Sequence, residues 1–155
     1  MKYIPEGHQD IEVFSIGYIL FSENVIKEAE VTRKEGRYID DKFGECKIEI
    51  CANEGQIPHF HLFNLDKSFE TCICIYSNNY FTHGGKYTNK LNKKQCKELN
   101  DWLKQPNIKT GAPLSNWQAI AFSWEVGNGE KCKFPEKRKV AIQPDYSELL
   151  NYKNN

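Results

Sequence analysis

Two histidines separated by one residue, His59 and His61, are the side chains whose type and spacing point most directly to chemistry. They lie in the segment Ile57–Phe63, and on a β-strand residues i and i+2 face the same side. His83 follows the next predicted strand and would join them, because three neutral imidazoles with one open position suit a catalytic zinc or iron ion. Glu49, on the preceding predicted strand, would add a carboxylate ligand or a general base. The predicted catalytic residues are therefore His59, His61 and Glu49, and the predicted metal ligands are His59, His61 and His83.

The same histidines would also suit metal-free acid–base cleavage of RNA, because two imidazoles that titrate near physiological pH can share the proton transfers. The segment Tyr80–Tyr87 offers aromatic rings for base stacking, two glycines that permit close backbone approach and one lysine for charge. Lys86 or Tyr87 would hold the phosphate. The predicted binding residues are Tyr80, His83, Lys86 and Tyr87.

Both motifs also have a purely structural interpretation. A buried histidine can pack its ring on neighbours and bond a backbone carbonyl or a carboxylate, and a Gly-Gly pair is common in simple turns. The sequence contains no Gly-x-Ser-x-Gly elbow and no phosphate-binding glycine loop, so nucleophilic catalysis and P-loop chemistry are not indicated. We therefore expect a non-enzymatic binding module that needs no cofactor, with a metal-dependent or histidine-based hydrolase or ribonuclease as the alternative.

The composition of the 155 residues bears on partners and location. Twenty-one basic and 21 acidic side chains give a formal net charge of zero, which gives no signal for DNA binding, whereas a protein partner fits and RNA stays open. Lysines dominate the basic residues, and Lys, Asn and Ile have AT-rich codons, so we expect a bacterial or phage source. No stretch approaches the roughly 18 apolar residues of a membrane span. Residues 1–10 lack the apolar core of a signal peptide, which predicts a cytoplasmic protein with mostly reduced cysteines.

These side chains need a sheet to position them, and the sequence predicts four strands. Residues 13–21 form a continuous β-branched and aromatic run, typical of a buried strand. Residues 45–51 alternate apolar and polar side chains, typical of a half-buried strand. Residues 57–65 and 69–76 follow after short turn segments, and we expect the last three runs to form an antiparallel meander.

Two helices are predicted after the strands. Residues 91–104 and 115–127 both place apolar side chains at helical spacing. Each begins with the sequence of a capping box, Asn92–Gln95 in the first and Ser115–Gln118 in the second. Gly127 is expected to end the second helix as its C-cap.

The order of strands first and helices afterwards predicts an α+β fold, with an antiparallel sheet of about four to five strands and two or three helices packed on one face. Residues 24–41 fit a short helix or an edge strand, residues 139–142 a further strand and residues 146–150 a helical turn. The whole chain (1–155) is expected to be one domain, with a core at about 11–127 and a C-terminal tail at 128–155.

The run Pro58-His59-Phe60-His61 follows a turn that contains Asn and Gly, and it precedes a helix with Trp102 and a segment with Asn116-Trp117. With these motifs, residues 46–124 resemble a family of small bacterial proteins catalogued as domain of unknown function 4160. The resemblance implies an α+β protein, often encoded beside a second small protein in a toxin–antitoxin arrangement. It therefore implies a small protein-binding module of a toxin–antitoxin, immunity or phage–host conflict system, and it assigns no activity to any residue.

Overall fold

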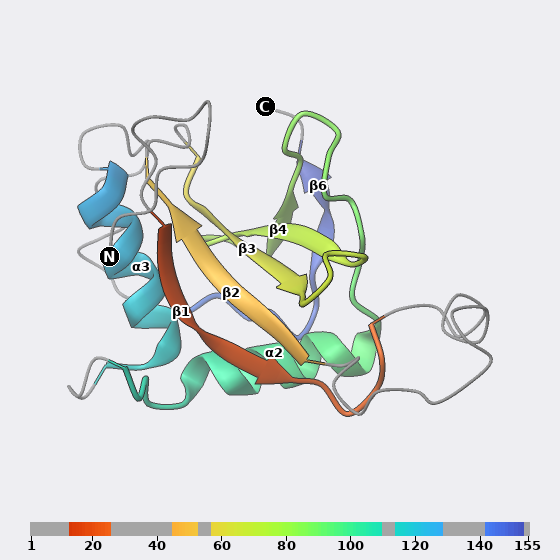
Figure 1. The fold of residues 1–155 in the computed structure, drawn as a ribbon, viewed down its shortest axis with the longest axis horizontal. Helices are drawn as coiled ribbons and strands as arrows, with labels where there is room; N and C mark the ends of the chain where they lie inside the picture. The colour runs from red at the N-terminus through yellow and green to blue at the C-terminus, as the bar shows by residue number, and fades with distance from the viewer. Residues whose placement is uncertain (1–12, 26–44, 53–56, 110–113, 129–141, 154–155) are drawn as a thin grey trace.

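The computed structural model describes residues 13–25, 45–52, 57–109, 114–128 and 142–153, and Figure 1 shows their arrangement. Its centre is one six-stranded sheet in which neighbours along the chain are also neighbours in space. The strands are β1 (Val13–Leu20), β2 (Glu45–Cys51), β3 (His59–Asn64), β4 (Glu70–Cys74), β5 (Asn79–Phe81) and β6 (Leu150–Lys153). The pairs from β1 to β5 are antiparallel, and β5 and β6 are parallel. The α+β class is confirmed, but the predicted antiparallel sheet of four to five strands is wrong, because the sheet is mixed and has six.

The alternation of side chains in β2 explains why the sheet buries one face. Cys46, Ile48 and Ile50 are fully buried, whereas the residues between them are partly exposed. Ile48 pairs with Leu62 on β3, so the apolar residues of neighbouring strands share the core face. All residues of β3 are buried, which shows that the opposite face of this central strand is covered as well.

The helices begin where the capping residues predict. Helix α2 (Lys93–Lys104) has Asn92 as its N-cap, and the reciprocal bonds of a capping box join Asn92 and Gln95. Helix α3 (Asn116–Asn128) is preceded by Ser115, which exchanges the same two bonds with Gln118. Each box satisfies donors that the first turn of a helix would otherwise leave without partners. Both predicted capping boxes are confirmed.

Gly127 lies inside α3, so its predicted role as the C-cap is wrong. A methyl group at this position would lie 2.8 Å from Cε2 of Phe14 and 3.2 Å from Cβ of Ala52. The glycine therefore lets the helix backbone approach β1 and the end of β2 closely.

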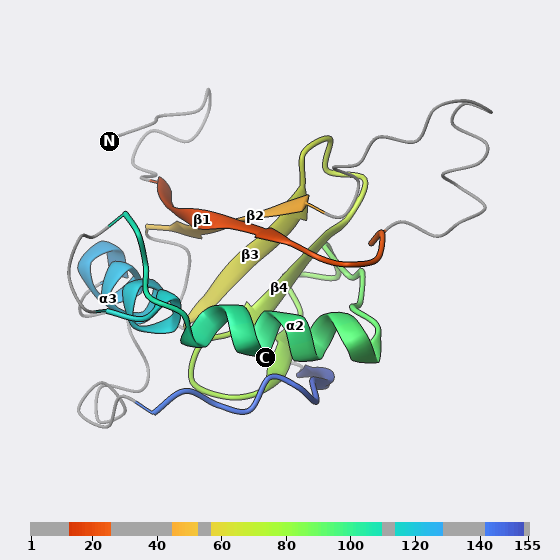
Figure 2. The same cartoon turned by 90° about the horizontal axis from the view of Figure 1, so that it is seen from below.

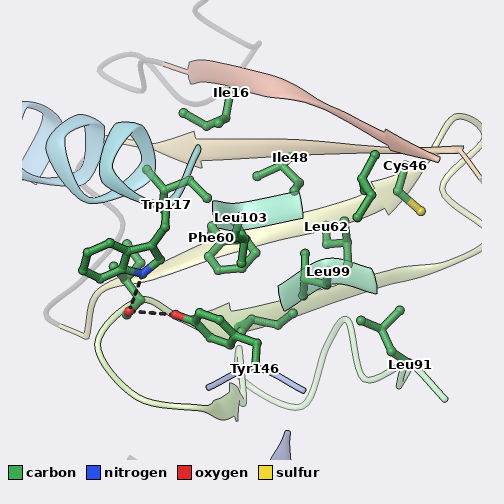
Figure 3. Packing of buried hydrophobic residues seen from close by; sticks show 14 of the residues in the cluster. Ile16, Cys46, Ile48, Phe60, Leu62, Leu91, Leu99, Leu103, Trp117 and Tyr146 are labelled. Atoms are coloured by element: carbon green, nitrogen blue, oxygen red, sulfur yellow. Dashed lines mark hydrogen bonds between the residues drawn. The ribbon is translucent and has the colours of Figure 1, made fainter. Parts of the chain in front are cut away.

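The core lies between the sheet and the two helices, which run on the same side of the strands (Figure 2). Trp117 of α3 and Tyr146 both reach the carbonyl oxygen of Ile75, as Figure 3 shows. The Trp117 indole N–H donates across 3.0 Å and the Tyr146 hydroxyl across 2.7 Å. The Tyr146 hydroxyl also lies 2.8 Å from the Cys74 oxygen, so the C-terminal segment is fixed to the end of β4.

The C-terminal segment differs from the prediction of a helical turn at residues 146–150. Only a short turn at Tyr146 remains, and residues 150–153 form β6 along β5. The backbone N–H of Leu150 donates to the Asn78 oxygen at 2.9 Å, which starts the parallel pairing. The predicted strand at residues 139–142 lies outside the described residues except for Ile142, and so does most of segment 24–41.

Candidate metal centre

His59 and His61 lie on the face of β3 opposite to that of Phe60 and Leu62, and Trp124 of α3 reaches the His59 ring there. Phe60 and Leu62 between and beside them point into the core and are fully buried, as the strand period predicts. His61 pairs with Glu49 of β2 on one side and with Cys72 of β4 on the other, so these three residues form one row across the sheet. Both histidines are buried, with exposed fractions of 0% for His59 and 6% for His61.

His83 reaches the same place through a tight hairpin after β5. The backbone N–H of Lys86 donates to the His83 oxygen at 3.1 Å and closes the turn. Gly84 and Gly85 between them have φ values of 62° and 81°, which only glycine adopts without strain. The predicted loop is therefore a turn, and its function in the fold is to place His83 beside the β3 histidines.

One ring nitrogen from each of His59, His61 and His83 lies within 4.8 Å of the other two. In a tetrahedral zinc site each nitrogen is about 2.0–2.1 Å from the ion, which places the ligands about 3.4 Å from one another. The three nitrogens would therefore have to move closer together to bind one zinc ion. Within the described part of the chain the group has three members, which is the ligand number of a site with one open position.

Two of the rings have their Nδ1 atoms directed to partners outside the cluster. His59 Nδ1 lies 2.8 Å from the Ile57 oxygen, and because a carbonyl can only accept, Nδ1 carries the proton. His61 Nδ1 lies 3.4 Å from Oε2 of Glu70. A histidine that donates from Nδ1 presents the lone pair of Nε2, and bound metals are usually held by rings oriented in this way.

Aromatic rings enclose the cluster. Phe81 stacks on His59 with ring centroids 4.3 Å apart, and the buried Trp124 of α3 lies 5.2 Å from the same ring. Tyr87 packs its edge against His61 and His83 at 5.7 and 5.4 Å. Its φ of 57° is unusual for a residue with a side chain, and such strain is found preferentially at functional sites. The rings give the three imidazoles an apolar shell that is open on the His83 side, where His83 is only partly buried.

The remaining predicted site residues are only partly brought together. Glu49 lies directly across from His61, but its carboxylate is paired with Lys47 at 2.9 Å. Lys86 is exposed on the hairpin. Tyr80 lies in the helical core, where its hydroxyl accepts the N–H of Leu91 at 2.8 Å, so it is separated from the histidines.

Sequence reasoning did not identify Glu70, Cys72, Phe81 or Trp124 as part of this region. Cys72 Sγ lies 3.4 Å from His61 Nδ1, and Glu70 is two residues before it on β4. A register for the predicted pair of strands at 57–65 and 69–76 would have placed both residues on the histidine face. No sequence signal would have placed Trp124 there, because its helical spacing only indicates the core.

No protein-family model, curated protein or solved structure matches this chain. The resemblance to domain of unknown function 4160 therefore stays a prediction. Within the described residues, none of the helices has the length and apolar content needed to cross a membrane.

Proposed function

We propose that His59, His61 and His83 bind a divalent zinc or iron ion and that the protein is a metal-dependent hydrolase. The observation that carries this proposal is the convergence of three ring nitrogens within 4.8 Å from two separate parts of the chain. Imidazole is a common ligand for both metals, and a site with three protein ligands leaves one position for substrate. A bound ion would supply Lewis-acid chemistry at that position.

The chain's own residues have distinct roles in this proposal. His59 and His61 would be the two ligands held by the central strand, where both are buried. His83 is the ligand at the accessible side. Glu49 shares the sheet face of His61, with the Lys47 ammonium 2.9 Å from its carboxylate, and would move a proton to or from the substrate.

Metal content of the untagged protein, purified and then equilibrated with zinc or iron, tests the proposal. We expect about one equivalent in the unaltered protein and far less in His59→Ala, His61→Ala and His83→Ala. His8→Ala is the matched control, since it removes the one remaining histidine of the chain, and it should keep the metal. Metal that is absent from the unaltered protein, or that survives equally in all three variants, would contradict the proposal.

The reaction is tested with RNA as the first substrate, since the sequence also suggested a ribonuclease. We expect cleavage by the metal-loaded protein that stops when a chelator removes the ion and is lost in His61→Ala. Cleavage that persists in the chelator would instead support acid–base chemistry by the histidines alone.

A second candidate function is protein binding, within a toxin–antitoxin, immunity or phage–host conflict pair. It is favoured by Phe122 and Val126, one turn apart on α3, which expose 61% and 60% of their surface. Neighbouring exposed apolar side chains are frequent at interaction sites. Size-exclusion chromatography with the product of an adjacent gene should give a complex that Phe122→Ser with Val126→Ser weakens. Separate elution of the two unaltered proteins would contradict it.

A further inference from the structure

We infer that Glu70 is the positioning residue of the histidine cluster. Its carboxylate accepts the Nδ1 proton of His61 and thereby directs the Nε2 lone pair of that ring to a divalent metal ion. The inference rests on the proposed metal centre and adds a residue to it that does not itself contact the ion.

The distance and the burial of the two groups support a direct interaction. Glu70 Oε2 lies 3.4 Å from His61 Nδ1, and only 13% and 8% of the two side chains are exposed. A carboxylate shielded from water in this way interacts more strongly with a nearby N–H than an exposed one does. An ion bound at Nε2 would make the Nδ1 proton more acidic and strengthen the bond.

The backbone holds Glu70 at this place independently of its side chain. Its N–H donates to Oδ1 of Asn89 at 2.9 Å, and the Asn89 N–H donates to the Glu70 oxygen at 3.3 Å. Next to it, Thr71 and Thr88 form a bridge. Asn89 and Thr88 belong to the segment that returns from the hairpin with His83, so Glu70 joins the strand beside His61 to the segment that carries the third ligand.

His59 has an equivalent arrangement, with the Ile57 oxygen in place of the carboxylate. Both β3 rings would then carry the proton on Nδ1 and leave the lone pair of Nε2 for a shared ion. Cys72 is the competing partner of His61, because its Sγ lies 3.4 Å from Nδ1 and 4.0 Å from Nε2. A thiol is a much weaker acceptor than a carboxylate, so we assign the proton to Glu70.

Two measurements test the assignment. The first is zinc affinity by competition with a chelator of known affinity: Glu70→Gln should bind zinc about 10–100-fold more weakly, and Glu70→Asp should recover part of the loss. Cys72→Ala and Asp101→Asn are the matched controls and should bind as the unaltered protein does. Asp101 is an exposed carboxylate on α2, so its loss reproduces the change of net charge away from the site.

The second measurement is the tautomer of His61 in the zinc-loaded, unaltered protein, from ¹⁵N spectra of its ring, and it requires no variant to fold. We expect a protonated Nδ1 and a metal-bound Nε2. A metal-bound Nδ1, or equal zinc affinity in Glu70→Gln, overturns the role of Glu70 and leaves the three-histidine centre intact. A loss of affinity in Cys72→Ala alone assigns the role to Cys72. Failure of the unaltered protein to bind zinc or iron overturns the metal centre and, with it, this inference.

Discussion

The three histidines differ in what surrounds them, although they share one cluster. His59 is fully buried and its ring contacts the rings of Phe81 and Trp124. His83 lies at the open side on a turn whose backbone is fixed by two glycines. Loss of either imidazole would remove one of the three proposed metal ligands, but the two losses should have unequal consequences for the fold.

We therefore expect His59→Ala to lower the free energy of unfolding by about 2–4 kcal/mol, because it leaves a cavity among packed rings. His83→Ala should lower it by less than about 1 kcal/mol, since a partly exposed side chain leaves little cavity. Urea unfolding in the presence of a chelator measures both without any contribution from metal. Equal destabilisation by the two variants would contradict this ranking.

Burial also affects Cys46, whose thiol it keeps in the protonated, unreactive form. Burial raises the pKa of its thiol from 9.0 to about 12, with a smaller contribution from the charge of Glu45. The folded protein therefore keeps this proton above pH 9, where the unfolded chain releases it. Between pH 9 and 12 this difference favours unfolding by about 1.4 kcal/mol per pH unit.

Stability should accordingly fall between pH 9 and pH 11, and fall less steeply in Cys46→Ala, although that variant is less stable at neutral pH because it leaves a cavity. Urea unfolding at pH 8 and at pH 10.5 provides the comparison. Parallel losses in the two proteins would show that other groups account for the alkaline effect.

At the scale of elements, the contact between α3 and the β1–β2 edge depends on one glycine. The helix approaches Phe14 and Ala52 so closely that a methyl group on Gly127 would lie 2.8 Å from the Phe14 ring. Alanine is a better helix former than glycine by about 1 kcal/mol. In Gly127→Ala, the gain in helix propensity therefore opposes the loss from the clash with Phe14.

We expect packing to prevail, so that Gly127→Ala lowers the unfolding free energy by about 1–2 kcal/mol. A smaller residue opposite should relieve part of the cost, so Phe14→Leu should be less harmful in the Gly127→Ala background than by itself. Chemical denaturation of the two single variants and the double variant measures the coupling. Additive effects would contradict the predicted contact.

At the scale of the whole molecule, the two ends of the described chain meet the sheet in different ways. β1 pairs with β2 in an antiparallel ladder whose register shifts once, between Ser15 and Gly17. At the other edge of the sheet, β6 pairs with β5 in parallel. Tyr146 fixes this C-terminal segment, because it is fully buried, donates to the end of β4 and has its own N–H bound to Oδ1 of Asn100 on α2. One residue thus connects the tail, the sheet and a helix.

Tyr146→Phe should cost about 1 kcal/mol, for the lost hydroxyl bonds, and Tyr146→Ala about 3–5 kcal/mol, for the cavity. Thermal and urea unfolding of both variants would check these values. A Tyr146→Ala protein as stable as Tyr146→Phe would show that the ring is not part of the core.

The proposed metal centre would also connect distant segments of the molecule, since His59 and His61 lie on β3 and His83 lies on the hairpin after β5. Free zinc at about 100 times its dissociation constant should stabilise the folded protein by about 2.7 kcal/mol. The melting temperature should therefore rise with zinc in the unaltered protein and stay unchanged in His61→Ala. An equal rise in both would indicate binding elsewhere on the chain.

The sequence by itself determined the features that depend on local backbone geometry. The strand period placed His59 and His61 on one face and Phe60 and Leu62 on the other, and all four lie as predicted. Both capping boxes could also be predicted from the sequence, because their hydrogen bonds join residues only three positions apart.

Only the tertiary structure decided which distant segments meet. The fold placed His83 and Glu70 beside His61, and it directed the side chain of Tyr80 towards the core. It also paired β6 with β5. These arrangements depend on strand register, on the path of turns and on which face each segment buries, and none of these is set by the period of the segment itself. The histidine pair could therefore be found in the sequence and His83 could be suggested as its neighbour, whereas only the fold placed Glu70 beside His61.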